Sequence, residues 1–214
     1  TTQFAHLTDH LIEDPDPDVA RLAPAQFRTV NVPGILSKTI HAFELLADRY
    51  DVFFRTNLSS MVMLSAFDRF VQSSTDVCYS GQFVWRDSLR SDLVAHGMVG
   101  PGRHVSDLAE LDGYPGDTFV SGSGYLLSAE EARSLVARRH QLRFDLPDDV
   151  AVGLMFERAR QLDGFAEILV PGLPVSEMIE RIKGTSAAHI RLQHFPVERA
   201  MALWRYVDRE RLWV

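Results

Sequence analysis

The sequence predicts an α/β domain with a mostly parallel central sheet flanked by helices. Short apolar runs rich in β-forming residues alternate along the chain with segments in which apolar residues recur every three to four positions. This alternation is typical of layered domains in which helices cover a parallel sheet. The 214 residues suit a single domain over the whole chain, interrupted by a long loop at about residues 86–118.

The first half of the chain predicts two helices, each followed by a strand. Ile40, Phe43 and Leu46 form the apolar stripe of the first helix, and Leu64 and Phe67 belong to that of the second. The run at 51–55 is short and apolar, as expected for a buried strand. The expected elements are a helix at residues 38–49, a strand at 51–55, a helix at 60–71 and a strand at 75–80.

The second half continues the alternation. Ser128 and Glu131 form a capping-box pattern, in which a hydroxyl and a carboxylate satisfy backbone amides at a helix start. Pro196 suits the first turn of a helix, because the amide that it lacks would have no partner there. The expected elements are strands at residues 118–121, 165–170 and 188–194, a helix at 149–160, and helices that start near Ser128 and Pro196.

Composition argues against several classes of protein. The 22 Lys and Arg residues against 29 Asp and Glu residues give a formal charge of −7, without the positive footprint of a nucleic-acid-binding protein. No apolar run reaches the ~18 residues of an integral membrane span, although peripheral membrane association stays compatible with the sequence. Cys78 is the single cysteine, so we expect no intrachain disulfide and a reducing, cytoplasmic setting.

Arg55, Thr56 and Asn57 stand at the end of the predicted strand at 51–55. A cation, a hydroxyl and an amide beyond the carboxyl end of a strand lie where α/β sheets bind ligands. The alternative is that Asn57 or Ser59 only caps the next helix. The two roles are compatible, and the residues alone leave the choice open.

A second polar segment, Ser121-Gly122-Ser123-Gly124, follows the predicted strand at 118–121. Glycine lets backbone amides approach a ligand closely, but the same residues suit a tight turn from a strand into a helix. Ser121 stands where a nucleophile elbow requires its first glycine, and the Gly-Lys-Ser/Thr ending of a phosphate-binding loop is missing. The segment predicts either a ligand-contacting turn or a purely structural one.

Asp148 and Asp149 stand at the start of the predicted helix at 149–160. They can be acids that the positive end of the helix dipole favours, or one of them can be a general base that takes a proton from a substrate. Adjacent helical residues diverge by about 100°, so the pair is poorly placed to flank one glycosidic bond as in a hydrolase.

The histidines give weaker evidence for a functional site than the segments above. His6 and His10 have the spacing of zinc ligands on a helix, with Asp9 between them, but no helical period surrounds them, and we interpret the pattern as coincidence. His189 and His194 lie in the late strand, where we expect packed or solvent-facing residues.

Taken in order, these segments resemble glycosyltransferase family 31, the fringe-like and β-galactosyl- or N-acetylglucosaminyltransferases. The chain looks most similar to the bacterial and large-virus relatives of that family. The resemblance covers roughly residues 38–160. It rests on Lys38-Thr39-Ile40, Phe53-Phe54-Arg55-Thr56-Asn57-Leu58-Ser59-Ser60, Ser121-Gly122-Ser123-Gly124-Tyr125-Leu126-Leu127-Ser128 and Asp148-Asp149-Val150-Ala151-Val152-Gly153.

The resemblance implies a GT-A-like nucleotide-sugar-binding fold and an inverting hexosyltransferase. Such an enzyme moves a sugar from a nucleotide-sugar, here expected to be UDP-linked, to a hydroxyl of a glycan or other acceptor, as in polysaccharide biosynthesis. The catalytic base would be Asp149. Apart from the resemblance, we expect the loop at 86–118 to recognise the acceptor, because loops on a rigid scaffold often carry specificity. The predicted substrate-binding residues are Lys38, Arg55, Thr56, Asn57, Ser121, Gly122, Ser123, Gly124 and Asp148.

The sequence departs from the family at the metal site. Family members carry an Asp-x-Asp motif that holds a divalent metal against the diphosphate, where this chain has Arg55-Thr56-Asn57. Mn or Mg prefers charged oxygen ligands, whereas arginine binds phosphate directly. We therefore assign no metal ligand and expect metal-independent or weakly metal-dependent transfer, in which Arg55 stabilises the leaving diphosphate. Dependence on Mn or Mg is the alternative.

Two points stay open at this stage. The first nucleotide-binding strand of a GT-A-like fold is not evident before Lys38, so it lies either within residues 4–30 or upstream of residue 1. The main alternative function is a catalytically silent carbohydrate-binding relative of the same fold.

Overall fold

The structure is a computed structural model. It describes residues 10–13, 27–30, 34–56, 60–74, 77–82, 84–85, 113–192 and 194–210. Asn57, His6 and residues 86–112 of the expected loop therefore lie outside the described residues.

The described chain contains both helices and strands, with several strands that follow one another directly. The helices are α3 (Ile35–Leu46), α4 (Leu64–Ser73), α6 (Ala129–Ala137), α7 (Asp148–Leu154), α8 (Val175–Gly184) and α9 (Val197–Arg209), with a 3₁₀ turn at Arg139–Gln141. The strands are β1 (His10–Glu13), β2 (Phe27–Val30), β3 (Val52–Thr56), β4 (Ser60–Val62), β5 (Ser80–Gly81), β6 (Val84–Trp85), β7 (Phe119–Val120), β8 (Gly124–Ser128), β9 (Arg160–Gln161), β10 (Ala166–Leu169) and β11 (His189–Leu192).

The two larger sheets are mixed, so the prediction of a mostly parallel sheet is wrong. The four-stranded sheet has the order β3-β8-β5-β9, in which β8 runs antiparallel to both β3 and β5 and only β5 and β9 are parallel. The three-stranded sheet has the order β10-β11-β4, with one parallel and one antiparallel pair. A continuous apolar run reports burial on both faces of a strand, and it carries no information on the direction of the neighbouring strands.

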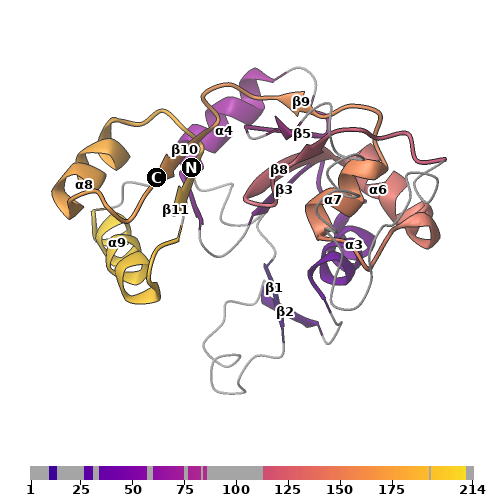
Figure 1. Cartoon of the computed structure of the whole chain (residues 1–214), viewed down its shortest axis with the longest axis horizontal. Coiled ribbons are helices and arrows are strands. Elements are labelled where there is room, and N and C mark those ends of the chain that lie inside the picture. The colour runs from indigo at the N-terminus through magenta and orange to yellow at the C-terminus, as the bar shows by residue number, and fades with distance from the viewer. Residues whose placement is uncertain are drawn as a thin grey trace.

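Strand β8 separates two hydrophobic cores. Tyr125 and Leu127 pack into the core formed with α3, α6 and α7, whereas Leu126 packs into the core formed with α4, α8, α9 and the three-stranded sheet. Figure 1 shows β3 and β8 in the middle of the molecule, with α3, α6 and α7 on one side and β10, β11, α8 and α9 on the other. Side chains alternate along a strand, so neighbouring residues of β3 and β8 enter different cores.

Several predicted elements are confirmed. Helix α3, strand β3 and the late strands β10 and β11 occupy the expected positions within a few residues. The capping box is formed as expected: Ser128 Oγ accepts from the Glu131 backbone N–H at 3.2 Å, and Glu131 Oε2 accepts from the Ser128 N–H at 2.9 Å. Pro196 precedes α9 directly, at its N-cap.

Other boundaries differ because tertiary pairing overrides the helical period. The predicted helix at 60–71 begins only at Leu64, since residues 60–62 form β4 and pair with β11. The predicted helix at 149–160 ends at Leu154, and Arg160 instead donates its N–H to the Tyr79 carbonyl at 2.9 Å as β9 joins β5. Of the expected strand at 75–80, the described residues 77–80 form a strand only at Ser80, in β5, and the sequence pattern did not predict helix α8.

Among the described residues, none of the helices has the length and apolar character needed to cross a membrane.

Candidate functional site

The segment Ser121–Gly124 joins two strands, β7 and β8, and not a strand and a helix as predicted. It folds back on itself through a hydrogen bond from the Gly124 N–H to the Ser121 carbonyl at 3.1 Å. We call residues 121–124 the Ser-Gly turn. Its position between the end of β7 and the start of β8 leaves the backbone groups of Gly122 outside the strand ladder, so other partners must satisfy them.

Asp149 satisfies the amide of this turn. Its Oδ2 accepts from the Gly122 N–H at 2.8 Å, and its Oδ1 accepts from the Val150 N–H at 2.9 Å. A Cβ atom at residue 122 would stand 3.2 Å from Asp149 Oδ2 and 3.3 Å from an Arg55 guanidinium nitrogen, so glycine permits this close approach. The predicted base and the predicted glycine-rich turn are therefore in direct contact.

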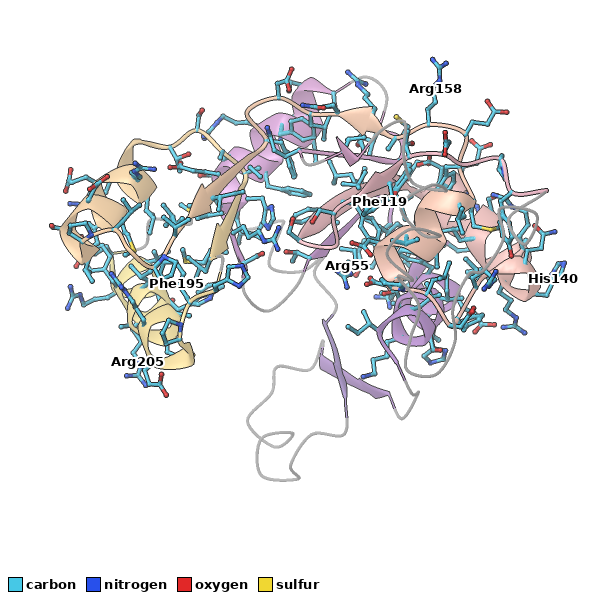
Figure 2. All side chains as sticks on the ribbon, viewed as in Figure 1. Arg55, Phe119, His140, Arg158, Phe195 and Arg205 are labelled. Carbon is cyan, nitrogen blue, oxygen red and sulfur yellow. The ribbon has the colours of Figure 1, made fainter. Side chains whose placement is uncertain are left out.

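Arg55 satisfies the carbonyl of the same residue. Its Nη1 donates to the Gly122 carbonyl, and its Nη2 lies 2.6 Å from Asp148 Oδ2 in an ion pair whose side chains are 13% and 11% exposed. Its guanidinium also lies 5.7 Å from the centre of the Tyr125 ring. Tyr125 is the residue of β8 that pairs with Arg55 of β3. Figure 2 shows Arg55 on the side of the middle strands that faces α3, α6 and α7.

Burial and neighbouring charges shape the electrostatics of this cluster. Burial raises the pKa of Asp148, the Arg55 cation opposes that rise, and the nearby Asp149 carboxylate adds to it. Burial also raises the pKa of Tyr125, so its hydroxyl keeps its proton. The hydroxyls of Ser123 and Tyr125 are buried without a hydrogen-bond partner among the described residues, which leaves them able to bind water or a polar ligand group.

Ser123, the residue after Gly122 in the turn, is contacted from the opposite face of the sheet. Thr56 Oγ1 donates to the Ser123 carbonyl at 2.9 Å, and Ser60 Oγ approaches the same carbonyl at 3.4 Å. Arg55 and Thr56 are neighbours in β3 and enter opposite cores. The Ser-Gly turn is thus held from both faces of the sheet, at Gly122 by Arg55 and Asp149 and at Ser123 by Thr56.

Most of the predicted site residues meet in one place. The structure brings together Arg55, Thr56, Ser121, Gly122, Ser123, Gly124, Asp148 and Asp149. Lys38 lies on α3 and takes part in none of these contacts, and Asn57 lies outside the described residues.

The helix-cap interpretations do not account for these residues. Helix α4 begins at Leu64 with Met63 as its N-cap, so capping by Asn57 or Ser59 is wrong. Helix α7 has Pro147 as its N-cap without a side-chain cap. Asp148 and Asp149 lie in its first turn, as expected for acids at the positive end of the helix dipole, and Asp149 also reaches beyond its own helix to Gly122.

The sequence pattern does not single out Tyr125, and it predicts His189 only as a packed or solvent-facing residue. Recognising Tyr125-Leu126-Leu127 as a buried strand would have placed Tyr125 opposite Arg55. His189 is 1% exposed and its Nε2 lies 3.3 Å from Thr56 Oγ1, a contact between distant segments that no local pattern reveals.

Among the described residues, no group of three or more His, Cys, Asp and Glu side chains could hold a metal ion. Asp148 and Asp149 are both engaged, one by Arg55 and the other by backbone amides. A metal at this cluster would have to displace or share those contacts.

No family model matches this chain, and no curated protein matches it. What the fold and the site define is a mixed α/β protein with a buried Arg55–Asp148 ion pair and a turn held by side chains from β3, β4 and α7.

The Arg55–Asp148 pair yields a stability prediction. Because both charges are largely buried, Arg55→Met leaves the Asp148 carboxylate without its partner and should cost about 3 kcal/mol of unfolding free energy. The matched change Arg181→Met, which breaks a surface pair with Glu177 at 45% and 47% exposure, should cost less than about 0.5 kcal/mol. Urea unfolding measures both. Equal losses would contradict a special role for the buried pair, whereas recovery in Arg55→Met with Asp148→Asn would support it.

The pKa of Asp148 yields a second prediction. Its folded-state pKa is raised above 3.8, so the folded protein holds this proton where the unfolded chain has lost it. The contribution of Asp148 to stability therefore falls as the pH rises from 3.8 through the raised pKa. Asp149→Asn should lower the pKa of Asp148, measured by carbon NMR of its carboxyl group, because a neighbouring negative charge is removed. The exposed control Asp163→Asn should leave it unchanged, and an equal effect of both variants would contradict the coupling.

Proposed function

We propose that this protein is an inverting glycosyltransferase with a GT-A-like fold, related to glycosyltransferase family 31. It would move a hexosyl group from a UDP-linked nucleotide-sugar to a hydroxyl of a glycan, in the cytoplasm. The proposal is carried by one observation: the Asp149 carboxylate lies 2.8 Å from the Gly122 amide, so the acidic and the glycine-rich segments on which the resemblance rests are in contact.

Asp149 is the general base in this proposal. Each of its oxygens accepts one backbone N–H, and a carboxylate oxygen can accept a second hydrogen bond from an acceptor hydroxyl. As Asp149 takes the proton of that hydroxyl, the acceptor oxygen forms a bond to the anomeric carbon of the donor. The bond from that carbon to the diphosphate breaks on the opposite face, and the nucleotide leaves with the electron pair.

Arg55 supplies positive charge for the leaving diphosphate. Its guanidinium has five N–H donors, of which the contacts to Gly122 and Asp148 use only a part. A diphosphate would compete with Asp148 for this cation. The raised pKa of Asp148 lowers the cost of that exchange, because its carboxylate is already destabilised by burial and takes up a proton more readily.

A carbohydrate-binding protein without catalytic activity is the second candidate. The same contacts favour this candidate, because both oxygens of Asp149 and the charge of Arg55 already bind protein groups and are less available for catalysis. In that case the cluster would serve to shape the Ser-Gly turn, and the turn would bind sugar without transferring it.

Thermal shift and turnover together test the proposed function. The full chain is screened against UDP, UDP-sugars and other nucleotide-sugars, with manganese and with excess chelator, because a bound ligand stabilises the folded state. We expect a UDP-sugar to raise the melting temperature in chelator. Asp149→Asn should then lower transfer to a glycan acceptor by about 10²–10⁴-fold while donor binding persists.

The control is Asp163→Asn, an exposed carboxylate outside the cluster, which should transfer at the wild-type rate. Sugar binding without any transfer by the wild-type protein would favour the carbohydrate-binding candidate. Transfer that is lost in chelator and restored by manganese would contradict the metal-independent role of Arg55. Release of free sugar in the absence of an acceptor would indicate a hydrolase.

A further inference from the structure

His189 lies where the two larger sheets meet beside the Ser-Gly turn. It belongs to β11, the middle strand of the three-stranded sheet, and it is 1% exposed. Its ring packs edge-on against Phe54 at 5.4 Å between ring centres. Its Nε2 lies 3.3 Å from Thr56 Oγ1 in the other sheet. Buried polar side chains are normally hydrogen-bonded, so the contact between His189 and Thr56 bears on the role of His189.

The distances at the Ser123 carbonyl favour one direction for this contact. The carbonyl can only accept, and its shortest contact among the described residues is the Thr56 hydroxyl at 2.9 Å, against 3.4 Å for the Ser60 hydroxyl. When the Thr56 hydroxyl donates its single proton to the carbonyl, its oxygen is left to accept, and His189 Nε2 takes the part of the donor. This requires an imidazole protonated on Nε2. Burial, together with the nearby Arg191 charge, lowers the pKa of His189 to about 4, so the ring is neutral at physiological pH.

A second observation connects His189 to the turn. A Cβ atom at residue 124 would stand 2.9 Å from His189 Cε1 and 2.9 Å from the Phe54 ring. The rings of His189 and Phe54 therefore pack against Gly124, the last residue of the Ser-Gly turn, and leave no room there for a side chain. The imidazole contacts the turn directly at Gly124 and through Thr56 at Ser123.

We propose that His189 is a positioning residue: its Nε2–H donates to Thr56, Thr56 donates to the Ser123 carbonyl, and this relay holds the Ser-Gly turn so that the Gly122 amide meets Asp149. The effect on the turn is independent of any activity. The effect on sugar transfer rests on the proposed function.

The tautomer is tested on the wild-type protein by nitrogen NMR of its histidine side chains. The proposal requires His189 to be neutral and protonated on Nε2 at pH 7. A neutral ring protonated on Nδ1, or a charged ring, would overturn it.

The positioning role is tested by amide hydrogen exchange at Gly122. His189→Phe keeps an aromatic ring against Phe54 but removes the donor, and Thr56→Val removes the hydroxyl while keeping the shape of the side chain. Each should speed exchange of the Gly122 amide by about fivefold to tenfold, the worth of one lost hydrogen bond. His189→Gln, which retains an N–H donor, should restore slow exchange. The exposed control His140→Phe should leave it unchanged.

Exchange at Gly122 that stays at the wild-type rate in His189→Phe would overturn the proposal, whatever Thr56→Val does. Should His189→Phe fail to fold, the nitrogen NMR of the wild-type His189 still tests its contact to Thr56, and Thr56→Val tests the second step of the relay. In a transfer assay, the relay predicts a lower kcat for His189→Phe, with recovery in His189→Gln. If the variants speed exchange at Gly122 but the wild-type protein transfers no sugar, the proposed function is contradicted and the relay is supported. If exchange at Gly122 is unchanged in the variants and the wild-type protein transfers sugar, the relay alone is contradicted.

Discussion

The backbone of Gly122 is the point on which the arrangement of this molecule depends. Its amide and carbonyl lie beyond the strand ladder, and each is satisfied by a charged side chain, Asp149 for the amide and Arg55 for the carbonyl. Unpaired buried backbone groups are costly, so these two contacts fix the start of α7 against the turn that leads into β8. The ion pair between Arg55 and Asp148 closes the set, and it brings both acidic residues of α7 to the turn.

A strand that separates two cores explains how a short turn can be held so firmly. Neighbouring residues of β3 point to opposite faces, so Arg55 reaches the turn from the side of α7 and Thr56 reaches it from the side of β11. Holding a backbone from both sides restricts it more than either contact alone. Such restriction would suit the transferase that we propose, because a reacting group that is misplaced by a small distance loses much of its effect.

The sequence predicted local features well and long-range ones poorly. The capping box at Ser128 and the stripe of Ile40 and Phe43 follow from nearby residues, and both are found. The direction of β8 and the strand at Ser60 depend on partners far along the chain, and there the helical or parallel expectation failed. At the site, polar residues at strand ends were identified one segment at a time. Their contacts were not predictable, because the ion pair of Arg55 and the role of His189 arise only when distant segments meet.

The central claim is that the Ser-Gly turn, with Asp149 beside it, is where the molecule meets its substrates. The most direct measurement is a titration of the isotopically labelled protein with a UDP-sugar, followed by the amide signals of Gly122, Gly124 and Val150. The account predicts saturable shifts of these three signals, larger than those of amides in α8 and α9. Saturable shifts confined to α8 and α9, or no shift with any nucleotide-sugar, would contradict it.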